Sequence, residues 1–508
     1  MEEDKEMKKN KYASRLAAAV LAASMLAGCG GKQAEETPVA VSEPDKITFA
    51  FFCNVLIPTD MDKVEAALNE VTREKINVEV KLVPMSMSTY MQQINLMISG
   101  GEKLDLFNMF GSEFAVAVAQ NKLAAMEPEL LSGEAKDATE ALGDYIKGAT
   151  VNGSVYGFPV LKDMANVRGV SMNKDILEKH GLLEEAEKVK SPDELAGLFD
   201  KLMTLEPDMV PVCAQNNGTS IMDSGFATYD SLGDRFGVLM DYGQGELKVE
   251  NLYETQWYED TVNYIHDWYE KGYILKDSSV NPDTGMPLYK SGKVFANMCD
   301  YHIATAPVIE NMSGIPTQGA WLADPLTTTT SMNGVVMAIP VTCKDQTPVM
   351  KFLNLMYTDP EVINIIDWGV EGDHYVHVDG TKNIITYPEG VTSDNTGYGM
   401  NCGWEFGNQL ISYVWENTGE DDYYDKMAEF NNSSKKSKAC GFSFDSGAVK
   451  TEIAALNNVT NEYRFGLENG EMDPDVYLPK FRQALKEAGI EKVIAEKQAQ
   501  LDAWAAAQ

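Results

Sequence analysis

The sequence predicts an α/β fold divided into more than one domain. Strand-like and helix-like segments alternate along the chain after residue 45, and its 508 residues exceed the ~100–200 that one domain usually holds. Hydrophobic residues make up 44% and charged residues 23%, a balance typical of globular proteins. The net charge of −35 argues against nucleic acids and anionic lipid surfaces as partners, because both are bound through clustered Lys and Arg.

The first predicted elements follow the order strand, helix, strand, helix, strand. The apolar run 47–52 predicts a buried strand, and Val64, Leu68 and Val71 mark the apolar face of a helix over residues 61–75. This order implies a sheet that is covered by helices on both faces. The next strand, helix and strand are predicted at 78–83, 89–98 and 104–109, with Gly100 and Gly101 ending the helix.

Helix-start signals mark the later elements. Ser191-Pro192-Asp193-Glu194 is a capping box, with Ser at the N-cap, Pro at the first helical position and Glu at the third. Asp359-Pro360 repeats the N-cap and Pro pattern before a helix that continues through 362–368. The other predictions are a buried strand over 334–340, an apolar helix over 350–357 and a helical C-terminus over 478–508 that Gly489 interrupts.

The N-terminal segment 1–28 is predicted to be a secretory signal. Basic residues between Lys8 and Arg15 precede the apolar run 16–26, which is much shorter than the ~20 residues of a membrane span. The six residues before Met7 include four that are acidic, which is unlike the start of a signal. We therefore expect the signal to begin at Met7.

The signal ends in Leu26-Ala27-Gly28-Cys29, which resembles the lipobox of bacterial lipoproteins. The resemblance implies cleavage before Cys29 and acylation of its thiol. Residues 29–44 lack hydrophobic periodicity and predict a lipid-anchored flexible tether. We expect the mature chain to be extracytoplasmic and to be held on the outer face of the cell membrane by its lipid.

Six cysteines remain after Cys29. Their even number permits disulfides in an exported protein, but they are scattered without the short spacing of a disulfide framework. The sequence has no Cys-x-x-Cys pair, so it gives no support to a structural zinc site. We favour buried free thiols at Cys53, Cys213, Cys299, Cys343, Cys402 and Cys440.

Several segments, taken in order, carry a family resemblance. Residues 96–110 combine a helix, a glycine turn and an acidic strand, residues 151–160 form a glycine-containing hairpin, and 172–177 contain Asn-Lys-Asp at a strand end. Together with the stretch 289–298, these segments resemble family 1 extracellular solute-binding proteins, lipoproteins that capture a substrate for an ABC importer. The tail resembles a subgroup with a C-terminal region of uncharacterised function, on the segments 351–361, 369–376, 442–445 and 496–504. The resemblance covers residues 29–508.

The resemblance implies a two-lobe periplasmic-binding-protein-like fold, with interlobe hinge crossings and a mostly helical C-terminus. In such proteins the ligand lies between the lobes, and lobe closure is what the ABC permease transmembrane subunits detect. We place lobe one at 45–162 with 333–372, and lobe two at 163–332 with 373–508. The hinge residues are then expected to be Lys162, Thr330, Glu371 and Gly372.

Candidate ligand-binding residues follow from the chemistry of sugar recognition. Aromatic rings pack against the C–H face of a sugar, while Asp, Glu, Asn and Arg hold its hydroxyls. Tyr301 follows the stretch where the family often places a stacking aromatic, and Asp300 precedes it. The other candidates are Trp404 and Glu405 in a Gly-rich loop expected to line lobe two, Ser112 and Glu113 at the carboxyl end of a strand, and Asp163 and Arg168 beside the first crossing.

Two aromatic or glycine-rich patterns favour structure over ligand contact. Trp257, Tyr264 and Trp268 are spaced as one face of a helix, so we interpret them as core residues. The segment 371–375 suits a hinge better than a ligand loop, because Gly372 tolerates backbone angles that other residues avoid.

A lipid-anchored glycoside hydrolase is the alternative class of protein. The nucleophile pattern Gly-x-Ser-x-Gly is absent, and acidic pairs such as Asp421-Asp422 are expected by chance among 77 carboxylates. His374 and His377 lack the His-Glu-x-x-His pattern of a zinc site, and the segment 281–285 lacks the later Glu of a calcium loop. The sequence therefore predicts a receptor that is not an enzyme and has no metal or cofactor.

The predicted function is capture of an oligosaccharide or glycoside between two lobes and its delivery to a permease. The alternative ligand is a peptide or another small polar solute. A monomer is expected. The sequence alone does not distinguish residues that contact the ligand from residues that form the hinge.

Overall fold

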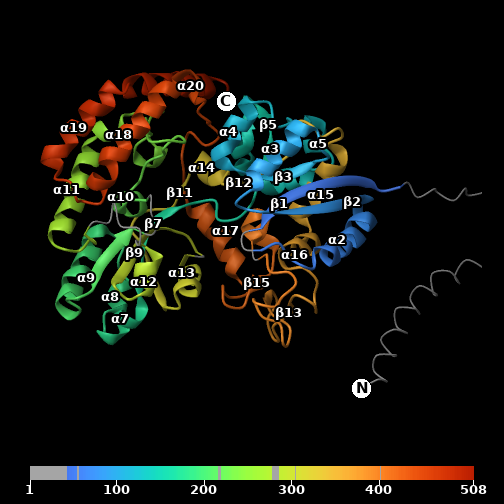
Figure 1. The fold of residues 1–508 in the computed structure, drawn as a ribbon, viewed down its shortest axis with the longest axis horizontal. Coiled ribbons are helices and arrows are strands. Elements are labelled where there is room, and N and C mark those ends of the chain that lie inside the picture. Colours follow the sequence, from blue (N-terminus) through green and yellow to red (C-terminus); the bar gives the residue numbers. More distant parts are fainter. Residues whose placement is uncertain (1–42, 54–55, 215–218, 277–284, 304, 401) are drawn as a thin grey trace, which may run out of the picture. The chain divides into compact units, whose positions relative to one another are not determined.

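Five strands form the sheet at the right of Figure 1, in the order β2, β1, β3, β12, β6. Strands β2, β1 and β3 are parallel, whereas β12 runs antiparallel to both of its neighbours. The strand at the centre of the parallel part is the predicted apolar run. The bounds are β1 Asp45–Cys53, β2 Val78–Ser86, β3 Leu106–Phe110, β6 Gly157–Pro159 and β12 Val335–Ala338.

Alternate side chains of β1 enter two hydrophobic cores, one on each face of this sheet. Phe49 and Phe51 lie in the core formed with α2, α15 and α16, whereas Ala50 and Phe52 lie in the core formed with α3 and α4. The two-residue period of a strand produces this division. Helices on both faces confirm the prediction made from the β-α-β-α-β order. The bounds are α2 Met61–Ile76, α3 Tyr90–Gly100, α4 Gly111–Ala119, α15 Thr347–Thr358 and α16 Pro360–Trp368.

Four strands form a second sheet, in the order β10, β7, β9, β8. Strand β7 is antiparallel to β9 and to β10, and β8 is parallel to β9. The bounds are β7 Val167–Asn173, β8 Val210–Ala214, β9 Val294–Tyr301 and β10 Thr317–Trp321.

The largest core lies between this second sheet and a group of helices that includes the C-terminus. Trp268 of α11 is 1% exposed there, and Trp257 and Tyr264 pack against the same core, which confirms their interpretation as core residues. The C-terminal helices lie beside α11 in Figure 1. The bounds are α9 Pro192–Leu205, α11 Gln256–Glu270, α18 Lys450–Glu468, α19 Pro474–Glu487 and α20 Ile490–Ala506. On the opposite face lie α12 Met286–Lys290 and α13 Thr305–Ser313.

The segments that connect the two sheets are hydrogen-bonded to one another. The Met164 carbonyl, between β6 and β7, accepts bonds from the Thr327 hydroxyl at 3.1 Å and the Ser331 hydroxyl at 2.9 Å. Asn431 of α17 (Tyr423–Ser433) accepts a bond from the Met164 amide and donates one to the Lys162 carbonyl, each at 2.7 Å. Strand β16 (Lys435–Lys436) then pairs with β11 (Leu326–Thr327).

The structure is a computed structural model that describes residues 43–53, 56–214, 219–276, 285–303, 305–400 and 402–508. The predicted signal, Cys29, residues 29–42 of the tether and residues 281–284 lie outside the described residues. The remaining helices are α5 Pro128–Ser132, α6 Lys136–Leu142, α7 Lys174–Lys179, α8 Leu183–Ala186, α10 Ile221–Gly225 and α14 Thr329–Met332. The remaining strands are β4 Thr150–Val151, β5 Ser154–Val155, β13 Val376–His377, β14 Ile384–Thr386 and β15 Val414–Trp415.

The predicted helix boundaries are confirmed where capping residues mark them. The Ser191 hydroxyl accepts a bond from the Glu194 amide at 3.3 Å, and the Asp359 carboxylate accepts one from the Glu361 amide at 3.0 Å. Gly489 separates α19 from α20 with φ of 95°, a conformation that glycine adopts without strain.

The six described cysteines are free thiols, as favoured from the sequence. Cys343 and Cys440 are half-buried rather than buried, which differs from the prediction. Burial raises the pKa of Cys53, Cys213 and Cys440 to about 12 and that of Cys299 and Cys343 to about 11. These five thiols are therefore protonated and poorly nucleophilic near neutral pH.

Candidate functional site

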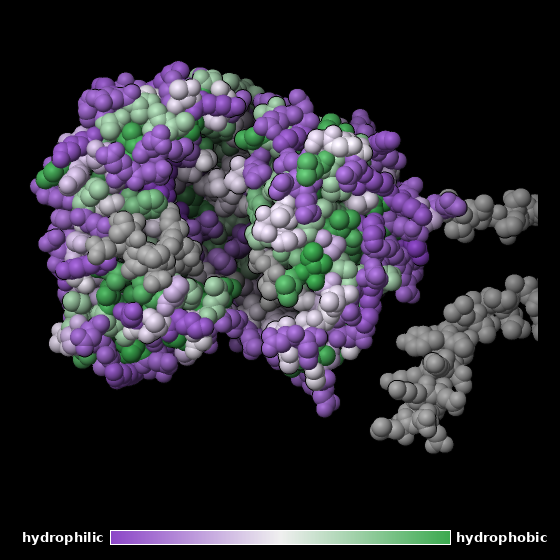
Figure 2. All heavy atoms as spheres, in the orientation of Figure 1, coloured by the Kyte–Doolittle hydropathy of each residue, from purple (hydrophilic) through white to green (hydrophobic). Residues whose placement is uncertain are grey.

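A polar recess of about 250 Å³ lies between the second sheet and α14. Helix α14 belongs to the segment that returns from the second sheet to the first. Its wall comes from the ends of β7 and β9, from α10 and the loop after it, and from residues 324–331. Figure 2 shows the surface hollowed between the parts built on the two sheets, where Figure 1 places α14 and β11. The lining residues are Asn166, Arg168, Thr219, Asp223, Ser224, Ala227, Tyr229, Ser231, Arg235, Asp300, Asp324, Leu326, Thr328, Thr330 and Ser331.

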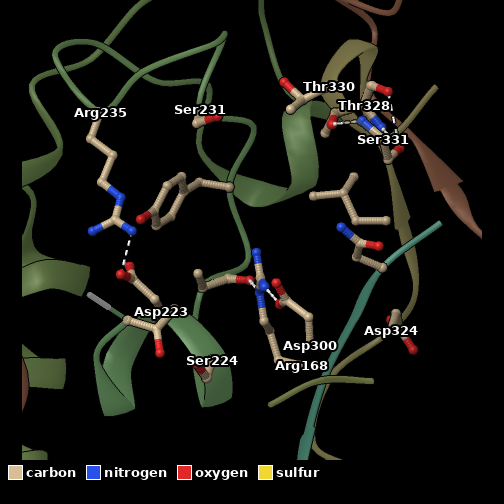
Figure 3. Close-up of a pocket in the computed structure, with 15 residues that line it drawn as sticks. Arg168, Asp223, Ser224, Ser231, Arg235, Asp300, Asp324, Thr328, Thr330 and Ser331 are labelled. Carbon is tan, nitrogen blue, oxygen red and sulfur yellow. Dashed lines mark hydrogen bonds and ion pairs between the residues drawn. The ribbon is translucent and has the colours of Figure 1, made fainter. Parts of the chain in front are cut away.

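Arg168 and Asp300 form an ion pair in the recess, and both were predicted to bind ligand. They are cross-strand partners in the antiparallel pairing of β7 with β9, so the sheet register itself brings them together. The Arg168 Nε also donates to the Ala227 carbonyl at 3.0 Å, which fixes the guanidinium. The Asp300 side chain remains 54% exposed, so a held carboxylate faces the solvent at the recess. In Figure 3 the two side chains point toward one another.

A second charged group lies at the α10 side of the recess. Asp223 of α10 pairs with Arg235, and the Arg464 guanidinium of α18 reaches the same carboxylate at 2.9 Å. Glu468, at the end of α18, lies 3.4 Å from Arg235 and is 0% exposed. Burial raises the pKa of Glu468 to about 7 and Asp223 adds to the shift, while the two guanidinium groups oppose it.

Hydroxyl groups line a further side of the recess. Thr328 caps α14 and forms a capping box with Ser331, which leaves the exposed Thr330 at the recess. Thr330 was predicted to be a hinge residue, and it lies in the segment between β11 and β12. Asp324 at the rim pairs with Lys435 at 2.8 Å.

Trp404 and Glu405 lie against the first sheet, whereas the sequence analysis expected them to line lobe two. Trp404 packs on Phe52 at 5.7 Å between ring centroids, and Phe110 stacks on Phe52 at 4.9 Å. Trp404 and Phe110 are half-buried, so they form an aromatic surface at the carboxyl ends of β1 and β3. Apolar residues such as Phe406 around Trp404 join the core of the first sheet, which explains the placement.

Glu405 is fully buried beside the strands that carry this aromatic surface and does not line the polar recess. Its carboxylate accepts bonds from the Phe52 amide at 3.0 Å and the Asn108 side chain at 3.1 Å. Burial raises the pKa of Glu405 well above its usual value. A structural role in joining β1 and β3 to the Gly-rich loop therefore explains this residue.

Tyr301 packs inside the second sheet rather than in the recess. It is 8% exposed and belongs to a small core with Val167, Tyr289 and Ile309. Its ring reaches over β7 to Gly319 of β10, where any side chain at Gly319 would collide with it. Alternation along β9 explains the difference, because Asp300 and Tyr301 must point to opposite faces.

The other predicted ligand residues lie away from the recess. Ser112 and Glu113 begin α4 and line a separate, largely apolar depression between α3 and α4. Asp163 lies in the first connection, where it pairs with Lys162 at 2.6 Å and with His302 at 3.3 Å. Asp163 and Lys162 therefore hold the connection between the sheets.

Glu371 and Gly372 lie in a turn that stays with the first sheet. Gly372 has φ of 85°, which explains the glycine. The buried His374 lies 3.4 Å from Asp60, and Asp373 lies 3.2 Å from Lys63 of α2. The later passage between the sheets runs instead through α17 and β16, some sixty residues beyond the predicted position.

Asp223, Arg235 and the hydroxyl-bearing residues of α14 were not among the ligand-binding residues predicted from the sequence. Two signals in the sequence point to them. Residues 327–331 read Thr-Thr-Thr-Thr-Ser, a run of hydroxyls at a predicted crossing. The chain has only six arginines, and Arg168, Arg235 and Arg464 meet at or beside the recess.

The described residues contain no cluster of three or more His, Cys, Asp or Glu side chains arranged to hold a metal ion. Within the same part of the chain, no helix combines the length and the apolar character that crossing a membrane requires.

Residues 66–369 match the sequence family of bacterial extracellular solute-binding proteins, a match that spans more than half of the chain. The chain belongs to this family. Residues 438–506 match a domain of unknown function, which agrees with the C-terminal region expected from the resemblance. The membership confirms the predicted class of protein.

One relative over the full length and one over about half of the chain carry related descriptions. A carbohydrate ABC transporter substrate-binding protein of Streptococcus pneumoniae is 28% identical over 502 residues, 97% of this chain and 98% of the relative. The polygalacturonan/rhamnogalacturonan-binding protein YtcQ of Bacillus subtilis is 21% identical over 46% of this chain and 51% of its own length.

The fold is similar to the crystal structure of the N-glycan transport solute-binding protein NgtS of S. pneumoniae, with a TM-score of 0.77 and 26% identity over 90% of this chain and 98% of that one. This likeness and the helical C-terminus confirm the predicted fold class. NgtS in complex with Man1GlcNAc gives a TM-score of 0.68, and in complex with Man5GlcNAc 0.64, each at 25% identity.

Proposed function

We propose that this protein is the receptor of an ABC importer for a neutral oligosaccharide. The observation that carries the proposal is the polar recess with its fixed Arg168–Asp300 pair. A sugar hydroxyl donates one hydrogen bond and accepts another, so an adjacent guanidinium and carboxylate match it in both roles. The full-length relative described as a carbohydrate ABC transporter substrate-binding protein supports the same ligand class.

The charges of the recess favour neutral over acidic sugars. Arg168 faces Asp300, and Arg235 faces Asp223 and Glu468, so each of the guanidinium groups lining the recess already has a carboxylate partner. A uronate would have to displace one of these carboxylates or remain uncompensated in a half-buried site. A neutral glycan meets neither cost.

The first sheet supplies an apolar surface that complements the recess. Trp404 and Phe110 present half-buried rings at the carboxyl ends of parallel strands, where α/β sheets bind their ligands. Sugar rings pack their C–H faces against such aromatic side chains. We therefore assign hydroxyl recognition to the recess and C–H contact to Trp404 and Phe110.

Two lobes that close on the ligand complete the proposal. Lobe one contains the first sheet and lobe two the second, with the passages near Lys162, near Thr330 and through α17. The TM-score of this chain against NgtS is lower for the two glycan complexes than for the NgtS structure whose description names no glycan. This trend supports a rearrangement of the lobes when glycan binds, which the ABC permease would detect. Family membership supports an extracellular site of action, and we propose anchoring through lipid on Cys29.

Calorimetric titration of the purified protein with Man1GlcNAc, Man5GlcNAc and trigalacturonate tests the ligand class. We expect saturable binding of at least one neutral glycan, no binding of trigalacturonate and no glycan cleavage by mass spectrometry. Binding of trigalacturonate alone, or of a short peptide alone when one is titrated as a further control, contradicts the proposal. Glycan cleavage favours the hydrolase alternative.

A matched pair of variants localises the binding. Asp300→Asn removes the charge of a carboxylate that is 54% exposed, and Asp373→Asn does the same at one that is 52% exposed and paired to Lys63, away from the recess. Because a hydrogen bond to a charged group contributes about 1.5–3 kcal/mol, Asp300→Asn should weaken glycan binding by about tenfold or more. Asp373→Asn should leave it unchanged. Equal effects of the two variants contradict the assignment of the recess.

A further inference from the structure

The C-terminal region of unknown function reaches the wall of the recess through the last turn of α18. Glu468 ends this helix, is 0% exposed and accepts a hydrogen bond from the Ser220 hydroxyl at 2.6 Å. The next residue, Asn469, accepts one from the Ile221 amide at 2.9 Å. Ser220 is the N-cap of α10, so two consecutive residues of the C-terminal region hold the start of that helix.

Helix α10 depends on such anchors, because it has only five residues. Isolated helices shorter than about 12 residues are marginally stable in water, so tertiary contacts must fix a helix of this length. The two residues that α10 contributes to the recess are Asp223 and Ser224. The position of this wall therefore depends on Glu468 and Asn469, which contact α10 but do not line the recess.

The same turn of α18 also fixes the charged groups of the wall. The Arg464 guanidinium lies 2.9 Å from the Asp223 carboxylate and 3.5 Å from that of Glu468. Arg235, which lines the recess, lies between these two carboxylates and pairs with both. In Figure 3 Arg235 and Asp223 point toward one another across this wall. Loss of Arg464 would leave two carboxylates competing for a single guanidinium.

We propose that the C-terminal region is part of the ligand-binding apparatus, with Arg464 and Glu468 as positioning residues for Arg235 and α10. The inference rests on the proposed function for the identity of the ligand, but its geometry is independent of any ligand. It gives the region a role beyond completing the hydrophobic core, because its charged residues determine where the donors and acceptors of the recess lie.

A matched pair of arginine variants separates positioning from stability. Arg464→Met removes a guanidinium that is 14% exposed and lies 2.9 Å from a carboxylate. Arg482→Met removes a similar one, also in the C-terminal region, which is 20% exposed and lies 2.8 Å from a carboxylate. Arg482 pairs with Glu259 of α11, away from the recess. We expect the two variants to lose similar thermal stability. Only Arg464→Met should weaken Man5GlcNAc binding, by about tenfold. Arg464→Lys should retain part of the affinity that Arg464→Met loses. Equal affinities of the two methionine variants overturn the inference.

A measurement without ligand keeps this test separate from the proposed function. Because the chain has six arginines, the arginine Nε–Hε region of its NMR spectrum is sparse and can be assigned by substitution. The Arg235 signal should shift in Arg464→Met and in Glu468→Gln but not in Arg482→Met. An unshifted Arg235 signal overturns the positioning inference even if the protein binds glycans. Failure of the unsubstituted protein to bind any neutral glycan, with the Arg235 shift present, contradicts the proposed function alone.

Discussion

Asn431 should be among the most stabilising polar side chains of the protein, because it holds the first connection between the two sheets. Its amide is 3% exposed and makes two hydrogen bonds of 2.7 Å, one from the Met164 amide and one to the Lys162 carbonyl. Met164 is fully buried, so water cannot replace the lost acceptor at its amide. Lys162 is half-buried, so its carbonyl is partly compensated.

The expected cost of Asn431→Ala follows from these two bonds. A buried group left without its partner costs about 1–3 kcal/mol, so the full penalty at Met164 and a partial one at Lys162 sum to roughly 2–4 kcal/mol. Urea unfolding of the purified protein, followed by circular dichroism, measures this loss as a lower midpoint with an unchanged slope.

The neighbouring Asn432→Ala is the matched control, because Asn432 lies on the same helix and is exposed. It should change the free energy of unfolding by less than about 0.5 kcal/mol. If Asn431→Ala is no more destabilising than Asn432→Ala, the reasoning about the connection is refuted.

Two further predictions follow from the buried side chains of Asp367 and Tyr301. Burial raises the pKa of Asp367 to about 7, so the folded protein retains a proton that the unfolded chain releases above pH 4. The free energy of unfolding should therefore fall by up to about 4 kcal/mol as the pH rises from 4 to 7. Urea titrations at several pH values should show a smaller fall for Asp367→Asn, whose amide mimics the neutral acid. The same pH dependence of the unfolding free energy in both proteins would refute this. Gly319→Ala should destabilise the protein by about 1–3 kcal/mol, because its Cβ would overlap the Tyr301 ring. Gly197→Ala is the control, because Gly197 lies in α9 with no atom near its Cβ, and it should stabilise the protein by roughly 0.5–1 kcal/mol. If Gly319→Ala leaves the thermal unfolding unchanged, the packing of Tyr301 is contradicted.

Local patterns predicted the elements of the fold because their causes are local. The apolar run at 47–52, the capping residues Ser191 and Asp359 and the break at Gly489 each act through neighbouring residues. The structure confirms all of them. The family resemblance, spread over many weak segments, predicted the class of protein that the comparisons confirm.

The sites of individual residues were harder to predict. Arg168 and Asp300 both line the recess, but only the antiparallel register of β7 with β9 makes them a pair. Tyr301 was predicted to bind ligand because of its residue type. Its side chain lies on the other face of the sheet, because it alternates with Asp300 along β9 and fills the space that Gly319 leaves. Trp404 was expected to line lobe two but packs with the core of the first sheet, because nothing local indicates which core the Gly-rich loop joins.

The sequence by itself predicted the first strands and helices, the capped helix starts, the core face of α11 and the class of protein, and it favoured free thiols, since each depends on residue type and short-range spacing. Only the tertiary structure decided the recess. Its wall joins α10 to Arg464 and Glu468, more than two hundred residues away, through a salt bridge and a hydrogen bond. Such contacts leave no periodic signal in the chain, because a salt bridge requires only that two side chains meet, whatever their separation in sequence.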